Sequence, residues 1–218
     1  MFVGHFGVAF AAKRISPQTN VAVAILATEF IDVLWPIAIL LGIEKVRIVP
    51  GLMAVSPFDF ISYPWTHSLL MSIIWGIVFG AVYYAIRRDG RAAVVMGAVV
   101  VSHWVLDFLT HRADMQLAPG LAGKYGLGLW NSRVGTYVVE LIIFFGGLAI
   151  YARTTRAKDA VGRWGFISYA ALLFVLYVAN MQGPPPPGVT TAVILMLAST
   201  AILLWWAWWF DRHREPVG

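Results

Sequence analysis

The residues best suited to chemistry lie inside long apolar stretches of the sequence. His103, Asp107 and His111 are spaced i, i+4 and i+8, so in a helix they form one stripe. Glu29 and Asp32, spaced i and i+3, share a helical face in another apolar stretch. Imidazole and carboxylate suit Zn²⁺, Mn²⁺ or Fe²⁺, whereas Ca²⁺ and Mg²⁺ prefer oxygen ligands. The pattern therefore predicts a divalent-metal site, most simply for zinc.

Three further ionisable groups occur in apolar surroundings, namely His5, His67 and Glu140. Together the candidates outnumber the ligands of one tetrahedral ion, which leaves room for a second ion or for a carboxylate acting as general base. A coordination position left open would bind water and lower its pKa towards about 7. The predicted metal ligands are His5, Asp32, His67, His103 and Asp107. The predicted catalytic groups are Glu29, Glu140 and His111.

The composition indicates which solvent surrounds these groups. Of 218 residues, 60% are hydrophobic and 12% are charged, against roughly 25% charged in soluble domains. The long apolar runs therefore point to a lipid bilayer. Cysteine is absent, so a metal can be held only by His, Asp, Glu or water. The first ten residues lack the basic region and cleavage site of a secretory signal, so we expect a mature N-terminus.

Hydropathy predicts an all-α, polytopic membrane protein that forms a single domain over residues 1–218. A short apolar stretch at about 2–14 precedes the full-length spans and covers only half of a membrane. Each full-length span is close to the ~20 residues that cross the hydrocarbon layer. The six predicted transmembrane helices are at about 19–42, 66–86, 91–111, 133–152, 163–182 and 189–210.

The basic residues predict the orientation. Strict alternation across six spans places eleven of the sixteen Lys and Arg on one side and five on the other. The richer side is expected to be cytoplasmic, which makes this an inner-membrane protein with a cytoplasmic C-terminus. Since the basic residues lie at span ends, we expect no nucleic-acid partner. With this orientation the buried His, Asp and Glu candidates fall in one layer of the outer, periplasmic leaflet. The orientation was derived from Lys and Arg alone, so this common depth is an independent observation.

Some residues allow two interpretations. In the first interpretation, Phe2–Ala12 is a half-helix that descends from mid-membrane. His5 then lies about 12 Å above the cytoplasmic boundary and completes the layer of ionisable groups. If this stretch is an amphipathic helix on the surface, His5 lies at the interface. Arg112 and Arg133 are candidates for binding a substrate phosphate, but each could instead pair with a carboxylate.

Several of these motifs together resemble a known family. They are the early His5, the acid pair ending in Asp32, Thr66-His67-Ser68, and Ser102-His103-x3-Asp107-x2-Thr110. They look like the bacterial membrane-bound metal-dependent hydrolases of the LexA-regulated inner-membrane group. More distantly they are similar to zinc-dependent phospholipase C, in which a helical bundle gathers His and Asp around zinc ions. The resemblance covers about residues 1–145.

The resemblance implies a metal-dependent hydrolase of lipids, with Asp32, His67, His103 and Asp107 as ligands and His5 and Glu140 as additions. The sequence departs from the pattern where Glu29-Phe30-Ile31-Asp32 replaces an acidic turn like Pro-Asp-Leu-Asp, within an apparently continuous apolar helix.

Two functions follow from these observations. The first is a zinc-dependent, phospholipase-like hydrolase of a lipid or lipid-linked ester or phosphoester, working from the outer leaflet with its long aromatic loops at about 43–65 and 112–132. The second is a divalent-metal or proton-coupled transporter. Transport requires a polar path to the other face, and the apolar runs 142–145 and 172–175 argue against one. A single buried His or Asp could also merely join two helices.

Overall fold

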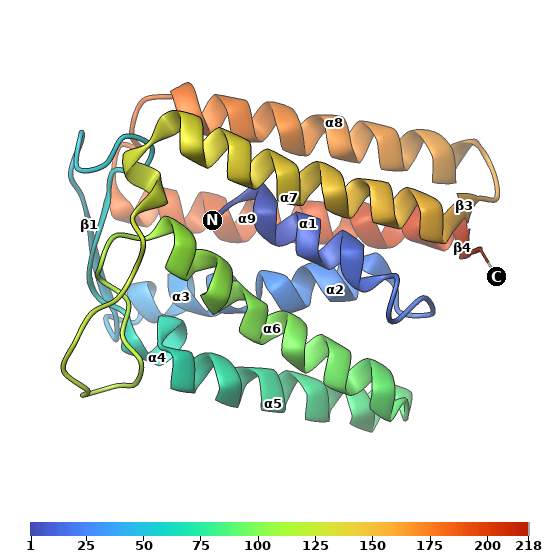
Figure 1. The fold of residues 1–218 in the computed structure, drawn as a ribbon, viewed down its shortest axis with the longest axis horizontal. Coiled ribbons are helices and arrows are strands. Elements are labelled where there is room, and N and C mark those ends of the chain that lie inside the picture. The colour runs from blue at the N-terminus through green and yellow to red at the C-terminus, as the bar shows by residue number, and fades with distance from the viewer. Residues whose placement is uncertain (218) are drawn as a thin grey trace.

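The chain forms a bundle of long helices with loops and short strands at its two ends (Figure 1). The computed structural model describes residues 1–217. Within them, five helices are long and apolar enough to cross a membrane on their own. These are α5 (Leu69–Arg87), α6 (Gly90–Thr110), α7 (Arg133–Thr154), α8 (Ala160–Gln182) and α9 (Val189–Arg212). They confirm the all-α, polytopic class and five of the predicted spans.

The first predicted span is broken rather than continuous. It consists of α2 (Val21–Thr28) and α3 (Phe30–Leu40), which meet at Glu29 with a bend of 50°. The carbonyl of Thr28 accepts a hydrogen bond from Nδ1 of His103, and a side chain inserted into the backbone ladder is a recognised cause of kinks. Pro36, inside α3, also lacks the amide that would bond back to residue 32. The expectation of an unbroken helix was therefore wrong, and the acid pair lies at the break.

The N-terminal helix α1 (Val3–Ala12) is a buried half-length helix that begins near the middle of the bundle (Figure 1). Its backbone touches that of α7, because a Cβ on Gly7 would lie 2.4 Å from the carbonyl oxygen of Ile143. Small residues allow such close approach between helices in membranes. His5 is fully buried, so the half-helix interpretation is confirmed and the surface-lying alternative is wrong.

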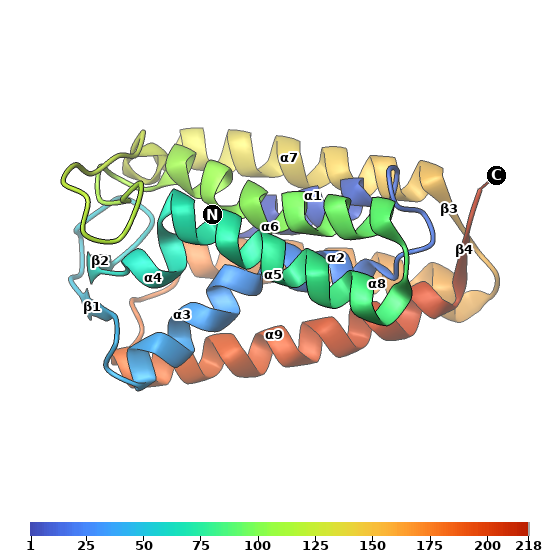
Figure 2. The ribbon, with the colours of Figure 1, turned by 90° about the horizontal axis from the view of Figure 1, so that it is seen from below.

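The loops at one end of the bundle hold a two-stranded antiparallel sheet of β1 (Lys45–Ile48) and β2 (Phe58–Ser62), followed by the single turn α4 (Pro64–His67). Residues 112–132, including the 3₁₀ turn η1 (Leu129–Asn131), cover the same end (Figure 2). At the opposite end, β3 (Thr155–Ala157) pairs with β4 (Arg214–Pro216). These are called the β1–β2 end and the β3–β4 end below.

A buried ion pair joins α1 to α9 near the β3–β4 end. Nζ of Lys13 lies 2.8 Å from Oδ2 of Asp211, and both side chains are buried. Asp211 also accepts hydrogen bonds from the Tyr151 hydroxyl and the Val21 amide. The sequence placed Lys13 and Asp211 among the charges at the span ends, yet the two hold the interior together.

Candidate metal centre

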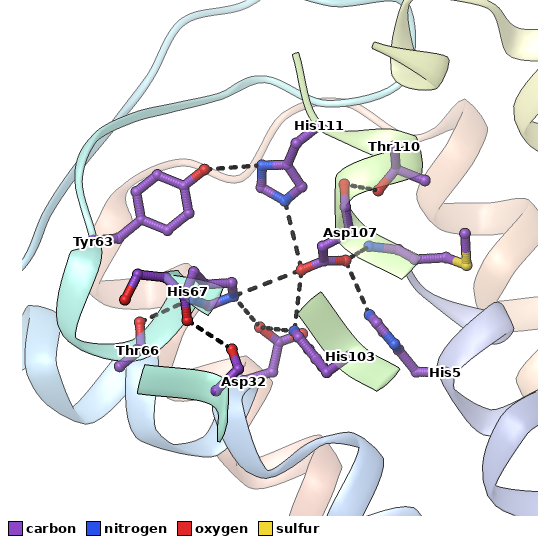
Figure 3. Close-up of polar contacts among 12 residues, drawn as sticks. His5, Asp32, Tyr63, Thr66, His67, His103, Asp107, Thr110 and His111 are labelled. Carbon is purple, nitrogen blue, oxygen red and sulfur yellow. Dashed lines mark hydrogen bonds and ion pairs between the residues drawn. The ribbon is translucent and has the colours of Figure 1, made fainter. Parts of the chain in front are cut away.

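Four elements bring the predicted ligands into one cluster (Figure 3). His5 comes from α1, Asp32 from α3, His67 from α4, and His103 and Asp107 from α6. These side chains are almost fully buried, except that of Asp32, which is 23% exposed. The break between α2 and α3 directs Asp32 towards the cluster, while the spacing within α6 stacks His103 and Asp107 one turn apart. The five predicted ligands therefore lie together.

Asp107 occupies the centre of the cluster. Its Oδ2 lies 3.0 Å from Nε2 of His103 and 3.7 Å from Nε2 of both His67 and His111. Its Oδ1 lies 3.1 Å from Nε2 of His5 and also contacts the amino group of Met1. One carboxylate thus faces four imidazoles from three segments of the chain.

Asp32 supplies the second carboxylate. Its Oδ1 lies 3.3 Å from Nε2 of His67 and 3.7 Å from Nε2 of His103. Two sets of three residues each place one ligand atom within 4.8 Å of the others, as a metal site requires. The sets are His5, His103 and Asp107, and Asp32, His67 and His103. Because Nδ1 of His103 is bonded to Thr28, only its Nε2 is available, and it can serve one ion at a time.

The hydrogen bonds behind His67 fix its tautomer. The hydroxyl of Thr66 donates to Oε2 of Glu44 across 2.7 Å, so its oxygen accepts from Nδ1 of His67 across 2.8 Å. Nδ1 therefore carries a proton, and Nε2 faces the carboxylates of Asp32 and Asp107. Glu44 also accepts the amides of Trp65 and Thr66, which secures the turn that holds His67.

His111 has a similar partner on its outer side. Its Nδ1 lies 3.1 Å from Oδ1 of Asp114, which also accepts from the Tyr63 hydroxyl across 2.7 Å. Metal-binding histidines commonly donate their other ring N–H to a carboxylate or carbonyl in this way. Burial raises the pKa of Asp114, but hydrogen bonds from His111, Tyr63 and Arg112 outweigh it and hold that pKa below its ordinary value.

The Nε2 atoms of His67, His103 and His111 therefore face the carboxylates of Asp32 and Asp107. Nε2 of His103 is buried 3.0 Å from Oδ2 of Asp107, but among residues 1–217 it makes no well-directed hydrogen bond. When such a ring carries its proton on Nδ1 alone, the Nε2 lone pair and a carboxylate oxygen repel each other in a buried site, and a cation between them reverses the sign of the interaction. Nitrogen and oxygen donors of this kind suit zinc or a similar transition metal. The residues present thus fit a divalent metal ion.

The predicted catalytic carboxylates lie beside the cluster rather than in it. Oε2 of Glu140 accepts the amides of Phe2 and Gly4 at 2.8 and 3.3 Å, so it anchors the start of α1 and with it His5. Glu29 lies at the helix break, and its buried Oε1 has no partner in the described part of the chain. His111, the third predicted catalytic group, lies among the ligands.

The two predicted substrate-binding arginines are engaged by the protein itself. Arg112 pairs with Asp59 on β2 and with Asp114, whereas Nε of Arg133 donates to the carbonyl of Ala54 across 2.9 Å. The hydrogen bond from Arg47, followed by the charge of Arg112, lowers the pKa of Asp59. Both arginines have the structural role that the sequence left open.

Residues that support the ligands were missed from the sequence. Glu44 and Asp114 were treated as ordinary loop charges, and Tyr63 as a loop aromatic. A signal was present for Asp114, because it follows His111 by three residues, within reach of its ring. None was present for Glu44, which lies 22 positions before Thr66.

The fold and the cluster define a polytopic α-helical membrane protein that gathers histidines and aspartates between its helices. The chain belongs to the YdjM inner membrane protein family, whose model matches residues 2–183. It is therefore a multi-pass protein of the inner membrane. The matched region runs from the start of α1 to the end of α8. Neither the curated proteins nor the solved structures contain a match.

Proposed function

We propose that this protein is a metal-dependent membrane hydrolase that cleaves an ester or phosphoester bond of a lipid or lipid-linked substrate. The observation that carries the proposal is the arrangement of His67, His103 and His111, whose Nε2 atoms all face Asp107 while their Nδ1 atoms are held from behind. Such preorganised donors are typical of catalytic metal sites.

The ion supplies a bound water of lowered pKa, which is the nucleophile of metal-dependent hydrolysis. Zinc is the metal that these donors suit best. The residues of the chain have separate roles around it. Asp107 and the histidines would hold the ion in the buried part of the cluster. Asp32 is the only ligand with an appreciably exposed side chain, so the reacting bond approaches from its side. Glu29, three residues before Asp32 and with a buried carboxylate oxygen that has no partner within residues 1–217, would accept the proton of the attacking water.

The location in the bilayer favours a lipid substrate. His111 ends α6 at the β1–β2 end, and the cluster extends from there into the bundle (Figure 3). The rings of Phe60 and Trp130 lie 4.7 and 4.4 Å from His111, so aromatic loops cover the cluster towards that end. The distribution of basic residues predicts that the β1–β2 end is the outer face, so the proposed reaction is in the outer leaflet.

The test is hydrolysis by the purified protein reconstituted in vesicles that contain a labelled phospholipid. Activity should require zinc, disappear with a chelator, and disappear in Asp107→Asn. The matched control is Asp159→Asn, because Asp159 also pairs with a histidine, His213, but does so at the β3–β4 end. If Asp107→Asn and Asp159→Asn hydrolyse equally, the proposed site is wrong.

The transporter is the competing function, and the same vesicles test it. The bundle below the cluster is closed by a core of buried apolar and aromatic side chains that includes Phe10, Phe144 and Tyr151. The apolar side chains of Phe10 and Phe144 in this core argue against a continuous polar path from the cluster to the buried Lys13–Asp211 pair. Zinc or proton uptake into the vesicles that depends on Asp107, without hydrolysis, would replace the hydrolase with a transporter.

A further inference from the structure

An open groove lies between the start of α8 and the last turns of α9, at the β3–β4 end. Its volume is about 430 Å³, which is in the range of small-ligand sites. The first turns of α8 and the last turns of α9 form the groove, and these helix ends lie at the far end of the bundle from the metal centre (Figure 1). The groove is lined by Ala160, Val161, Trp164, Gly165, Ile167, Ser168, Trp206 and Trp209.

The sequence explains why a groove forms there. Gly165 allows α8 to approach α9 closely, since a Cβ at this position would lie 2.8 Å from Cβ of Phe210. A tryptophan ring projects from each helix, Trp164 from α8 and Trp209 from α9, and their side chains are 59% and 38% exposed. Small Ser168 leaves space between them. The groove is therefore apolar, it is lined by tryptophan rings, and it lies at the end of the two transmembrane helices.

Two arginines lie at the helix ends that form this groove. The guanidinium of Arg163 lies 5.3 Å from the ring of Trp164, which lines the groove. Arg212 follows the lining residue Trp209 by three positions, and its guanidinium lies 4.6 Å from the ring of the neighbouring Trp208. Within residues 1–217 neither arginine forms an ion pair, because the nearby acidic side chains pair with other basic residues. Asp159 pairs with His213 at 2.6 Å and Glu215 pairs with Arg156 at 2.7 Å.

We propose that the groove binds one anionic phospholipid, with an acyl chain against the tryptophans and the phosphate between Arg163 and Arg212. An apolar groove with basic residues beside it, at the end of two transmembrane helices, is complementary to such a lipid. The acyl chain would contact the apolar lining, and the anionic headgroup would contact the arginines. This site is separate from the metal centre and does not rest on the hydrolase proposal.

Native mass spectrometry of the detergent-purified protein tests the site with added phosphatidylglycerol or phosphatidylcholine. Phosphatidylglycerol should bind more tightly. Two basic residues near the membrane surface should contribute roughly thirtyfold to its affinity, so Arg163→Gln/Arg212→Gln should lose about that much. Binding of phosphatidylcholine should change little in this variant.

The matched control is Arg87→Gln/Arg91→Gln, which removes two exposed charges from α5 and α6 at the same end of the bundle. It should leave the affinity for phosphatidylglycerol unchanged. Ser168→Leu should weaken both lipids by filling the groove, and the thermal midpoint of each variant without lipid checks its folding. Equal losses in the two arginine pairs, no preference for phosphatidylglycerol, or full binding by Ser168→Leu would each overturn the proposal. So would a dimer whose formation excludes lipid.

Discussion

Nδ1 of His103 donates a hydrogen bond across 2.6 Å to the carbonyl oxygen of Thr28, the last residue of α2. This one contact orients the ring of a central candidate ligand, with Nε2 towards Asp107, and also engages the backbone of the first span where it bends. The bend in turn places Asp32 beside His67 and His103. The orientation of the ligands and the path of the backbone are therefore coupled.

The hydroxyl of Thr66 is expected to determine metal affinity without touching the metal. Thr66→Val removes the acceptor behind Nδ1 of His67, and loss of such an outer partner typically weakens binding by about 10–100-fold. Thr66→Ser retains the hydroxyl and should restore the affinity. Zinc competition against a chromogenic chelator measures both variants. Equal affinities in Thr66→Val and the wild type would mean that His67 is not a ligand.

The contact between α1 and α7 is expected to tolerate no side chain. Gly7→Ala places a methyl group 2.4 Å from the carbonyl oxygen of Ile143, so the helices must separate, at a cost of about 1–3 kcal/mol. Gly146→Ala is the matched control, since nothing lies within 4 Å of a Cβ there. Thermal unfolding in detergent compares the two. A Gly7→Ala protein as stable as Gly146→Ala would contradict the packing of α1.

Removal of one partner from the buried Lys13–Asp211 pair should be costly. Lys13→Met leaves Asp211 without its cation in the interior, a change that typically costs about 3–5 kcal/mol. Lys13→Met/Asp211→Asn removes both charges and should recover part of that stability. The measurement is the thermal midpoint of the single and double variants. Should the double variant be the less stable of the two, the pair would not act as described.

The stability that Asp59 contributes should depend on pH. Its folded pKa is lowered, so its contribution is complete above the ordinary value of about 3.9 and is lost as the pH falls through the folded pKa. The stability difference between the wild type and Asp59→Asn should therefore shrink below about pH 4. It should not exceed about 1 kcal/mol, because Arg47 is largely exposed. A difference that grows in acid would contradict the ion pairs of Asp59.

Sequence patterns predicted most of the fold because spans in a bilayer are set by length and hydropathy. Residues 133–152 and 189–210, for example, were expected as helices and lie within α7 and α9. The break at Glu29 escaped prediction because it depends on His103, 74 positions away, rather than on any local signal of the helix itself. Pro36 was visible, but it lies inside α3 and not at the bend.

Some residues of the candidate site could be predicted from the sequence, and others could not. His103 and Asp107 were predictable because one helix fixes their spacing, and a common depth indicated that Asp32 and His67 join them. The partners behind the ligands were not predictable, since contacts such as Glu44 with Thr66 arise only when loops fold over the end of the bundle. Burial of Lys13 was equally hidden, because its partner Asp211 lies 198 positions later.

The central claim is that His103 and its neighbours hold a metal ion, and elemental analysis of the purified protein tests it most directly. We expect at least one zinc per chain in the wild type and in the control His213→Ala. In His103→Ala, purified in the same way and shown to be folded, we expect almost none. Equal metal content in His103→Ala and His213→Ala, or no bound metal in the wild type after purification with zinc, would contradict the account.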